Sequence, residues 1–551
     1  MQKGKTIVNK MYDKSMLAFV KDCRANTGNR DVWSFYGKRK TRDDFYLEID
    51  RVAAFLASHK WGKDDSIAVC LPNIPDAIVT TYAINKIGAV ANIIHPLVPS
   101  EGLRHIVENI GSSALFIFDL FFEKHRQVIE ELNIPTIVCS VQDYVSKPLA
   151  AMLKLATRNK TKGIEYGKKI YRYSDIVRTE PINIEDRGTG EDIAVYLHSG
   201  GTTGSPKTVM LSNRALNALA DKTKNLVNSG FDENDSMLMV LPLFHGFGLG
   251  VCMHTVLSAS GRVVLMPSFN AKKAIKLLKS EKITYIAGVP TMYDKMMDEP
   301  SFVGKHLKTL KHCYCGGDKL PEATKTRFDE LLKKSGNPIS LNEGYGLTEV
   351  VTVCAVNTEE ESRFPSVGKG LDGVRFKIID SDGNTLPIGE IGEICVNTEA
   401  TMSGYFGDEA TTMKTMKKDA NGDIWIHTGD IGYLDEDGFL YFKDRLKRMV
   451  KIAGVNVFPK EIEELVEKMP EIRFATAISS KLNGKQIIKL FVVMQSGYTF
   501  TSEVEDNIRK KIASELMKYS VPKIIECRKE LPLTAVGKVD YKQLQEIEDK
   551  N

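Results

Sequence analysis

The chain has 551 residues, well beyond the ~250–300 residues at which a single hydrophobic core usually stops growing, so we expect more than one domain. Its 42% hydrophobic and 26% charged residues are typical of a globular protein, and a net charge of +4 is too small to indicate nucleic acid or a membrane as the main partner. Nine cysteines, an odd number without pattern, predict free thiols in a reducing, cytoplasmic compartment. Cys313 and Cys315 have no second pair or nearby histidines at zinc-ligand spacing.

The first half of the chain alternates between strand and helix patterns. The N-terminal stretch MQKGKTIVNKMYDKSML carries charges throughout and does not predict a secretory signal. Apolar runs at residues 66–71 and 114–118 predict buried strands, with a helix at residues 76–87 between them. A helix at 271–278 and a strand at 283–287 continue the pattern. The fold class that this alternation predicts is α/β, with layered sheets and helices.

Two stretches raise the question of a membrane. Residues 236–261 carry no Asp, Glu, Lys or Arg, but Pro242, two histidines and several glycines and serines favour a buried core beside a site over a membrane span. Residues 147–162 (KPLAAMLKLATRNKTK) predict a basic amphipathic helix followed by a polar run. It is either a surface helix packed on its own domain or a patch that contacts a membrane or an acidic partner, so we expect at most peripheral membrane contact.

From about residue 380 the pattern changes. Tight-turn dipeptides at 382–383, 421–422 and 437–438 separate short apolar segments and predict a β-rich subdomain. After Arg445 a compact α+β pattern follows, with a helix opened by Pro459 and a strand at residues 487–494. Ser502 and Glu505 have the spacing of a capping box at the head of another helix. We therefore expect a large domain over residues 1–444 and a small one over residues 445–551.

A glycine-rich stretch, HSGGTTGSPKTVML, spans residues 198–211 and is suited to hold phosphate. Glycines let backbone N–H groups approach phosphate oxygens, Ser199, Thr202 and Thr203 add hydroxyls, and Lys207 adds a charge. The stretch fails the Walker A pattern, because Pro206 precedes the lysine and a strand follows it instead of a helix. The sequence predicts a hairpin whose second strand leads into a helix capped by Ser212.

The stretch resembles the phosphate loop of the AMP-forming acyl-CoA synthetases, the adenylate-forming superfamily that includes firefly luciferase and the adenylation domains of nonribosomal synthetases. Gly200 takes a place often held by serine, and Thr208 replaces a usual glycine. Further segments resemble the family's motifs in the same order: PLFHGFG at 242–248, GGD at 316–318, EGYGLTE at 343–349, TGD at 428–430, DRLK at 444–447, and PLTAVGK at 532–538. The last has leucine where the family has lysine in P-K-T.

The resemblance implies a role for each matched residue. Tyr345 stacks on adenine, Thr348 contacts the α-phosphate, and Asp430 and Arg445 hold the ribose. Glu349 helps to hold Mg²⁺, since a carboxylate beside a triphosphate needs a hard cation between them. The implied ATP-binding residues are Ser199, Gly200, Gly201, Thr202, Thr203, Gly204, Lys207, Gly317, Asp318, Glu343, Gly344, Tyr345, Gly346, Thr348, Asp430 and Arg445.

The resemblance also implies a mobile C-terminal domain. Lys538 is the catalytic lysine, with Lys451 and His245 as further catalytic candidates, and Lys447 is the hinge. His245, Phe247 and Gly248 line the acyl pocket; Ala453 and Gly454 line the coenzyme A tunnel.

The implied reaction joins a small carboxylic acid to ATP and then to coenzyme A. Residues 244–249 offer no carboxylate for a substrate ammonium, which disfavours amino acids. Medium- or long-chain fatty acids are favoured over aryl acids. A carrier-protein phosphopantetheine thiol is the alternative acceptor. The alternative enzyme is thus an acyl-AMP ligase that loads an aryl or fatty acid onto this carrier-protein thiol. A luciferase-type oxidation and a nucleotide-binding scaffold without activity are disfavoured, and no nucleic acid partner is expected.

Overall fold

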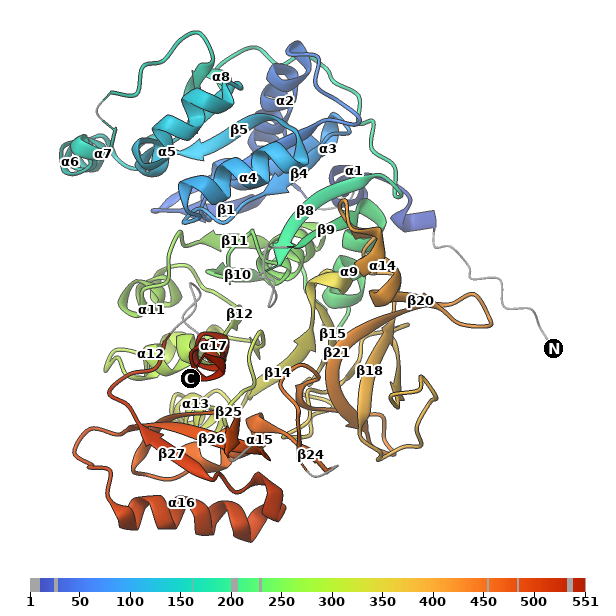
Figure 1. Cartoon of the computed structure of the whole chain (residues 1–551). Coiled ribbons are helices and arrows are strands. Elements are labelled where there is room, and N and C mark those ends of the chain that lie inside the picture. The colour runs from blue at the N-terminus through green and yellow to red at the C-terminus, as the bar shows by residue number, and fades with distance from the viewer. Residues whose placement is uncertain are drawn as a thin grey trace. The chain divides into compact units, whose positions relative to one another are not determined.

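The computed structural model describes residues 10–23, 28–161, 163–199, 207–226, 230–452, 455–482, 485–532 and 539–550. It divides into two compact units (Figure 1). Unit 1 comprises Met1–Arg375 and Val396–Ile426, and unit 2 comprises Phe376–Cys395 and His427–Asn551. The domain boundary expected at residues 444–445 from the change in sequence pattern stays a prediction.

Unit 1 contains two large sheets. Six strands of the first run parallel and two antiparallel strands extend its edge. Its order is β19 (Gly404–Tyr405), β9 (Lys207–Ser212), β8 (Ile193–Ser199), β4 (Val90–Ile93), β3 (Ser66–Cys70), β5 (Ser112–Phe118), β6 (Thr136–Cys139) and β7 (Ile170–Arg172). The second sheet runs β16 (Lys369–Gly370), β15 (Val353–Val356), β14 (Leu341–Gly346), β13 (His312–Cys315), β12 (Tyr285–Gly288), β10 (Ser236–Met239), β11 (Arg262–Leu265), β1 (Asp31–Phe35) and β2 (Lys38–Thr41).

Helices cover both faces of these sheets, which is why the parallel strands are apolar throughout. In β10, Met237 and Met239 join a core cluster shared by both sheets, whereas Leu238 packs with the helices on the opposite face. The shared core includes α1 (Met16–Asp22), α2 (Arg42–Ser58), α3 (Pro75–Lys86), α9 (Asn213–Lys224), the π-helix η3 (Phe247–Thr255) and α10 (Val256–Ser258). The outer faces carry α4 (Ser100–Ile110) and α5 (Asp119–Leu132) on the first sheet, and α11 (Ala271–Ser280), α12 (Pro290–Met297) and α13 (Glu322–Lys334) on the second. The α/β prediction is confirmed.

The remaining elements of unit 1 are short. They are α6 (Lys147–Ala156), α7 (Arg158–Thr161), α8 (Tyr173–Ile176), α14 (Glu409–Thr415) and the 3-10 turns η1 (Lys10–Tyr12), η2 (Val141–Tyr144), η4 (Lys305–Thr309) and η5 (Thr348–Val350). The charge-free stretch 236–261 forms buried core, as predicted. Among the described helices, none has the length and apolar character needed to cross a bilayer.

A third sheet contains β17 (Arg375–Ile379), β18 (Gly392–Asn397), β21 (Ile424–Leu434) and β20 (Met416–Lys418), with β22 (Leu440–Arg445) paired to β21. The division between the two units runs through β17, β18 and β21. The glycines of the three predicted turn dipeptides all adopt positive φ, which confirms those turns: Gly383 at +89°, Gly422 at +86° and Gly438 at +82°.

The C-terminal part of unit 2 is α+β, as predicted. Its strands are β23 (Val450–Ile452), β24 (Val455–Val457), β25 (Ile472–Leu482), β26 (Lys485–Met494) and β27 (Ile524–Cys527); its helices are α15 (Pro459–Glu467), α16 (Ser502–Glu515), α17 (Tyr541–Asp549) and the turn η6 (Lys518–Ser520). The capping-box prediction was wrong. Thr501, not Ser502, is the N-cap of α16, because its extended backbone lets Oγ1 accept the Val504 N–H, and Glu505 pairs with Arg509 instead.

Candidate active site

The phosphate-loop hairpin is formed by β8 and β9, which pair antiparallel with Ser199 opposite Lys207. Gly200, Gly201, Thr202, Thr203 and Gly204 lie outside the described residues. Lys207 directs its ammonium over the ring of Tyr405, 4.6 Å from the centroid. Tyr405 belongs to β19, which pairs with β9 opposite Val209. Strand pairing thus supplies the loop lysine with an aromatic platform.

Tyr405 also connects Lys207 to the predicted metal ligand. Its hydroxyl donates to Oε1 of Glu349 at 2.6 Å, and the Glu349 carbonyl accepts the Met402 N–H at 2.8 Å. Burial, together with the Glu349 charge, raises the pKa of Tyr405, so the phenol stays protonated as a donor. We did not predict Tyr405, because only the pairing of β19 with β9 brings it to the site.

Thr208, the departure from the family glycine, has a defined partner in the hairpin. It lies opposite His198, and its Oγ1 is 3.0 Å from His198 Nδ1. His198 Nε2 is 2.6 Å from Asn92 Oδ1, while Asn92 Nδ2 donates to Ser112 Oγ at 3.0 Å. Since Asn92 accepts through Oδ1, Nε2 carries the proton and Nδ1 accepts from Thr208. Burial lowers the pKa of His198 to about 4, so this ring is neutral near pH 7.

Glycines of the PLFHGFG and EGYGLTE segments allow both segments to lie close to the backbone of residues 351–352. A Cβ on Gly246 would lie 1.7 Å from the Val351 carbonyl oxygen. A Cβ on Gly346 would lie 1.6 Å from the Thr352 carbonyl oxygen. Both atoms are backbone and cannot move away cheaply, so the backbone of residues 351–352 can take this position only with glycine at 246 and 346.

Val351 is the strained residue at this meeting point. Its φ of 64° and ψ of −58° define a γ-turn, closed by the Thr352 N–H donating to the Val350 carbonyl at 2.8 Å. A β-branched residue rarely adopts positive φ, and such strain persists mainly at functional sites. The turn directly follows Glu349 in the chain. The sequence carries no signal for it.

His245 and Phe247 lie at the start of the π-helix η3. His245 is exposed, and its Nδ1 accepts the Phe247 N–H at 3.2 Å. The Phe247 ring faces Gly316, where an added Cβ would lie 3.2 Å from Cε1. Gly248 is similarly confined, with an added Cβ 2.1 Å from the Pro242 carbonyl oxygen. His245 is thus not a buried core histidine, and π-helices occur frequently at functional sites.

The predicted adenine segments follow the carboxyl ends of adjacent parallel strands, where ligands bind in open α/β sheets. Gly317, with φ of +78°, and the exposed Asp318 follow β13. On β14, Glu343 is buried and its Oε1 accepts the Leu320 N–H at 2.8 Å. Gly344, Tyr345 and Gly346 complete that strand, and Thr348 opens the turn η5.

The predicted ribose pair lies in unit 2. Asp430 on β21 is directly opposite Arg445 on β22, and Arg445 Nε is 3.4 Å from Asp430 Oδ1. The Asp430 residue is only 3% exposed, whereas the Arg445 side chain is 57% exposed. Thr428 Oγ1 donates to the Ile394 carbonyl and accepts the Asp430 N–H. The backbone thus presents a carboxylate and a guanidinium together, as the motif predicts.

Glu393 supports this turn from β18. Its carboxylate accepts the Gly429 N–H at 3.0 Å and lies 3.1 Å from Nδ1 of His427. Within the described residues, Glu393, Cys395 and His427 bring potential metal-ligating atoms within 4.8 Å of one another. Because the carboxylate already holds the turn and the imidazole, we interpret the cluster as structural support for Asp430.

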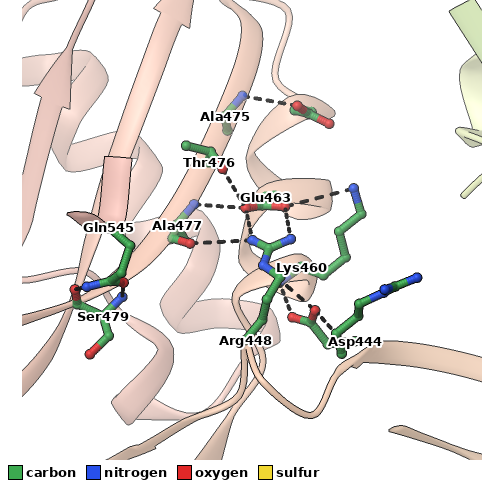
Figure 2. A network of polar contacts seen from close by, with 11 residues as sticks. Asp444, Arg448, Lys460, Glu463, Ala475, Thr476, Ala477, Ser479 and Gln545 are labelled. Carbon is green, nitrogen blue, oxygen red and sulfur yellow. Dashed lines mark hydrogen bonds and ion pairs between the residues drawn. The ribbon is translucent and has the colours of Figure 1, made fainter. Parts of the chain in front are cut away.

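The predicted hinge lies between two anchored residues (Figure 2). Before it, Asp444 accepts the backbone N–H of Lys460 at 2.8 Å, which caps the first turn of α15. After it, Arg448, whose side chain is 11% exposed, forms an ion pair with Glu463, which also accepts from Thr476 and Ala477. Burial raises the pKa of Asp444. Lys447 itself is exposed, and its role as a hinge stays a prediction.

Lys451 is exposed on β23, opposite Asn456 on β24. Ala453, Gly454 and Lys538 lie outside the described residues, so their roles stay predictions. All nine cysteines are unpaired, as predicted.

Comparison with known proteins defines the class. The AMP-binding enzyme family model matches residues 20–406, and that of the AMP-binding enzyme C-terminal domain matches residues 461–538. A long-chain-fatty-acid–CoA ligase of Bacillus subtilis (strain 168) is 30% identical over 98% of this chain and 95% of that protein. The 4-coumarate–CoA ligase 3 of Oryza sativa subsp. japonica is 27% identical over 91% and 86%. The ATP-bound MatB structure from Rhodopseudomonas palustris shares the fold, with a TM-score of 0.83 and 22% identity over 97% and 99%.

The chain belongs to the AMP-binding enzyme family, as an AMP-forming acyl-CoA synthetase of the adenylate-forming superfamily. This membership supports ATP, coenzyme A and a small-molecule carboxylic acid as substrates.

Proposed function

We propose that the acid is a medium- or long-chain fatty acid, which the enzyme converts to acyl-AMP and then to acyl-CoA. The observation that carries this proposal is the 30% identity to a long-chain-fatty-acid–CoA ligase over 98% of the chain. An amino acid would need a carboxylate for its ammonium, and residues 244–249 contain none.

In the first half-reaction a carboxylate oxygen attacks the α-phosphorus of ATP, the bond from that phosphorus to the bridging oxygen breaks, and pyrophosphate leaves. Two anions must meet, so the barrier is largely electrostatic. Lys538 would neutralise the carboxylate and the α-phosphate, while Lys207 would hold the departing phosphates. Asp430 and Arg445 would fix the ribose, so that the reactants are held in line.

Glu349 would hold Mg²⁺ beside these phosphates. Its carboxylate oxygen is the hard ligand that Mg²⁺ prefers, and Tyr405 fixes its orientation through a 2.6 Å hydrogen bond. When bound, Mg²⁺ supplies charge neutralisation for the phosphate oxygens.

Tyr405→Phe is expected to raise the Mg²⁺ concentration needed for half-maximal pyrophosphate release several-fold. An unchanged Mg²⁺ dependence would contradict the role given to Glu349.

In the second half-reaction a thiol attacks the acyl carbonyl, the carbonyl carbon–oxygen bond to AMP breaks, and the thiol proton passes to solvent. Rotation about Lys447 would withdraw Lys538 and bring the segment of Lys451, Ala453 and Gly454 to the acyl-AMP. We propose that the attacking thiol is that of coenzyme A and that the reaction takes place in the cytoplasm. A carrier-protein phosphopantetheine arm is the alternative acceptor.

The acid is tested by competition among octanoate, palmitate, benzoate and 4-coumarate, with ATP and coenzyme A. We expect palmitate or octanoate to dominate acyl-CoA formation. Dominance of benzoate or 4-coumarate would refute the fatty-acid proposal. Product formation only with an added carrier protein would refute coenzyme A as the acceptor.

Lys538 is tested by separating the half-reactions. Lys538→Ala is expected to abolish acid-dependent pyrophosphate release and to leave thioester formation from supplied acyl-AMP largely intact. Lys529→Ala removes an exposed lysine of the same unit and serves as the matched control, expected to retain both half-reactions. Equal loss of both half-reactions in a folded Lys538→Ala protein would overturn the assignment.

A further inference from the structure

Helices α6 and α7 form a basic apolar surface on unit 1 that the reaction does not use. We define it as residues 147–161. Figure 1 draws both helices at the outer edge of unit 1, beyond α5. None of their residues is buried, although α6 is rich in leucine, alanine and methionine. A helix of this composition usually buries an apolar face, so its exposure requires an explanation.

The two faces of α6 differ in exposure. Leu149, Ala150 and Leu153 are half-buried. On the other face, Met152 is 67% exposed and Leu155 is 74% exposed, the highest value for a large apolar side chain among the described residues. With 3.6 residues per turn these two side chains are neighbours, and Pro148, Ala151 and Ala156 extend the same exposed face.

The charged side chains of α6 and α7 themselves are all positive. Lys147, Lys154, Arg158 and Lys160 are exposed, and no Asp or Glu occurs between residues 144 and 164. Throughout the described part of the chain, none of these four cations is in an ion pair. By helical geometry Lys147 and Lys154 lie along one edge of the apolar face. The complement of such a surface is apolar at its centre and anionic around it.

Helix α11 shows that composition alone does not produce this surface. It is also basic and apolar, with the sequence AKKAIKLLKS. Its Ala274, Ile275 and Leu278 are buried in the core of unit 1, and its lysines are exposed. The apolar side chains of α11 thus have a protein partner, whereas Met152 and Leu155 on α6 stay exposed among the residues that the structure describes.

We propose that α6 and α7 dock on the surface of an anionic lipid bilayer. Met152 and Leu155 would enter the boundary between headgroups and acyl chains, and the four cations would contact lipid phosphates. This is how an interfacial amphipathic helix binds, with its axis in the membrane plane. Each Lys or Arg close to an anionic surface strengthens binding roughly fivefold, and the effect is screened by salt.

The test is sedimentation of the full chain with sucrose-loaded vesicles. One set contains phosphatidylcholine alone, and in the other about a third of the lipid is phosphatidylglycerol. We expect binding to the anionic set, weak binding to the neutral set, and loss of binding at about 0.5 M salt. Met152→Ser with Leu155→Ser, and separately Lys154→Glu with Arg158→Glu, should each weaken partitioning roughly tenfold or more.

The charge-matched control is Lys276→Glu with Lys279→Glu on α11, which should bind within about twofold of the wild type. Circular dichroism and the urea midpoint show whether each variant folds, and vesicle binding does not depend on which acid the enzyme uses. Failure of the wild type to bind anionic vesicles overturns the proposal, even if it binds an acidic protein. Equal loss in the α11 control, or full binding by the Met152 and Leu155 variant, also overturns it.

Discussion

Replacing Thr208 by valine tests whether the residue that departs from the family glycine positions the phosphate-loop lysine. Valine has the shape of threonine but lacks its hydroxyl, so the variant leaves His198 Nδ1 without its donor at 3.0 Å. An unsatisfied buried acceptor costs about 1–3 kcal/mol. Because His198 is half-buried, we expect the lower part of that range, about 1–2 kcal/mol in the free energy of unfolding.

The consequence for ATP follows from strand geometry. Successive side chains of β9 point to opposite faces, so the contact of Thr208 with His198 fixes the direction in which Lys207 leaves the strand toward Tyr405. We assume that about 1 kcal/mol of the free energy of the Thr208–His198 hydrogen bond keeps Lys207 in position for ATP. Loss of that hydrogen bond then lowers kcat/KM for ATP about fivefold. We expect the change mainly in the KM for ATP, and little change in the KM for the acid.

The measurements are urea unfolding and ATP-dependent pyrophosphate release. Thr208→Ser keeps the hydroxyl and should recover most of kcat/KM. Thr136→Val is the matched control, because Thr136 lies on β6 of the same sheet and its hydroxyl donates to the Ile134 carbonyl. This variant should leave the KM for ATP unchanged. If Thr208→Val matched Thr136→Val in KM for ATP, the positioning argument would be wrong.

Three further outcomes are expected. Glu463→Ala removes the nearer ion-pair partner of Arg448 (Figure 2), leaving Asp444 at 3.9 Å, and should destabilise unit 2 by about 1.5–3 kcal/mol, seen as early urea unfolding; an unchanged midpoint would contradict this. Gly246→Ala places a Cβ 1.7 Å from the Val351 carbonyl oxygen and should cost at least about 1–3 kcal/mol and most of the activity; full activity would refute the contact. Burial lowers the pKa of His254 to about 3 from 6.5, so the unfolded chain takes up a proton first and stability falls as the pH drops below 6.5. His254→Gln should show a smaller decrease in urea midpoint between pH 7 and pH 5, and an equal decrease would contradict that origin.

Local patterns predicted those elements in which sequence neighbours determine the conformation. The apolar runs of β3 and β5, the helix α3 between them and the turn glycines at 383, 422 and 438 all follow from near-neighbour chemistry. The N-cap of α16 shows the limit. Thr501 and Ser502 offer adjacent hydroxyls, and the extended backbone of Thr501 decides which of them accepts the Val504 N–H.

Motif order likewise identified the enzyme class, because residues that bind a common substrate occur at recognisable spacings along the chain. Glu349, Asp430, Arg445 and Lys207 were all named from sequence. The support around them was not. Glu393, which holds the turn before Asp430, is distant in sequence and in no motif that we recognised.

The sequence by itself determined the α/β class, the turns and the list of candidate ligands, since these depend on short-range periodicity and on residue type. Only the tertiary structure decided that Tyr405 contacts both Lys207 and Glu349 and that Thr208 donates to His198. It also decided that Val351 adopts a strained backbone conformation with positive φ. The Tyr405 contacts join segments far apart in the chain, whereas Thr208 faces His198 across one hairpin and Val351 lies in a tight turn packed against Gly246. Their geometry depends on sheet register and packing, which local propensity does not encode.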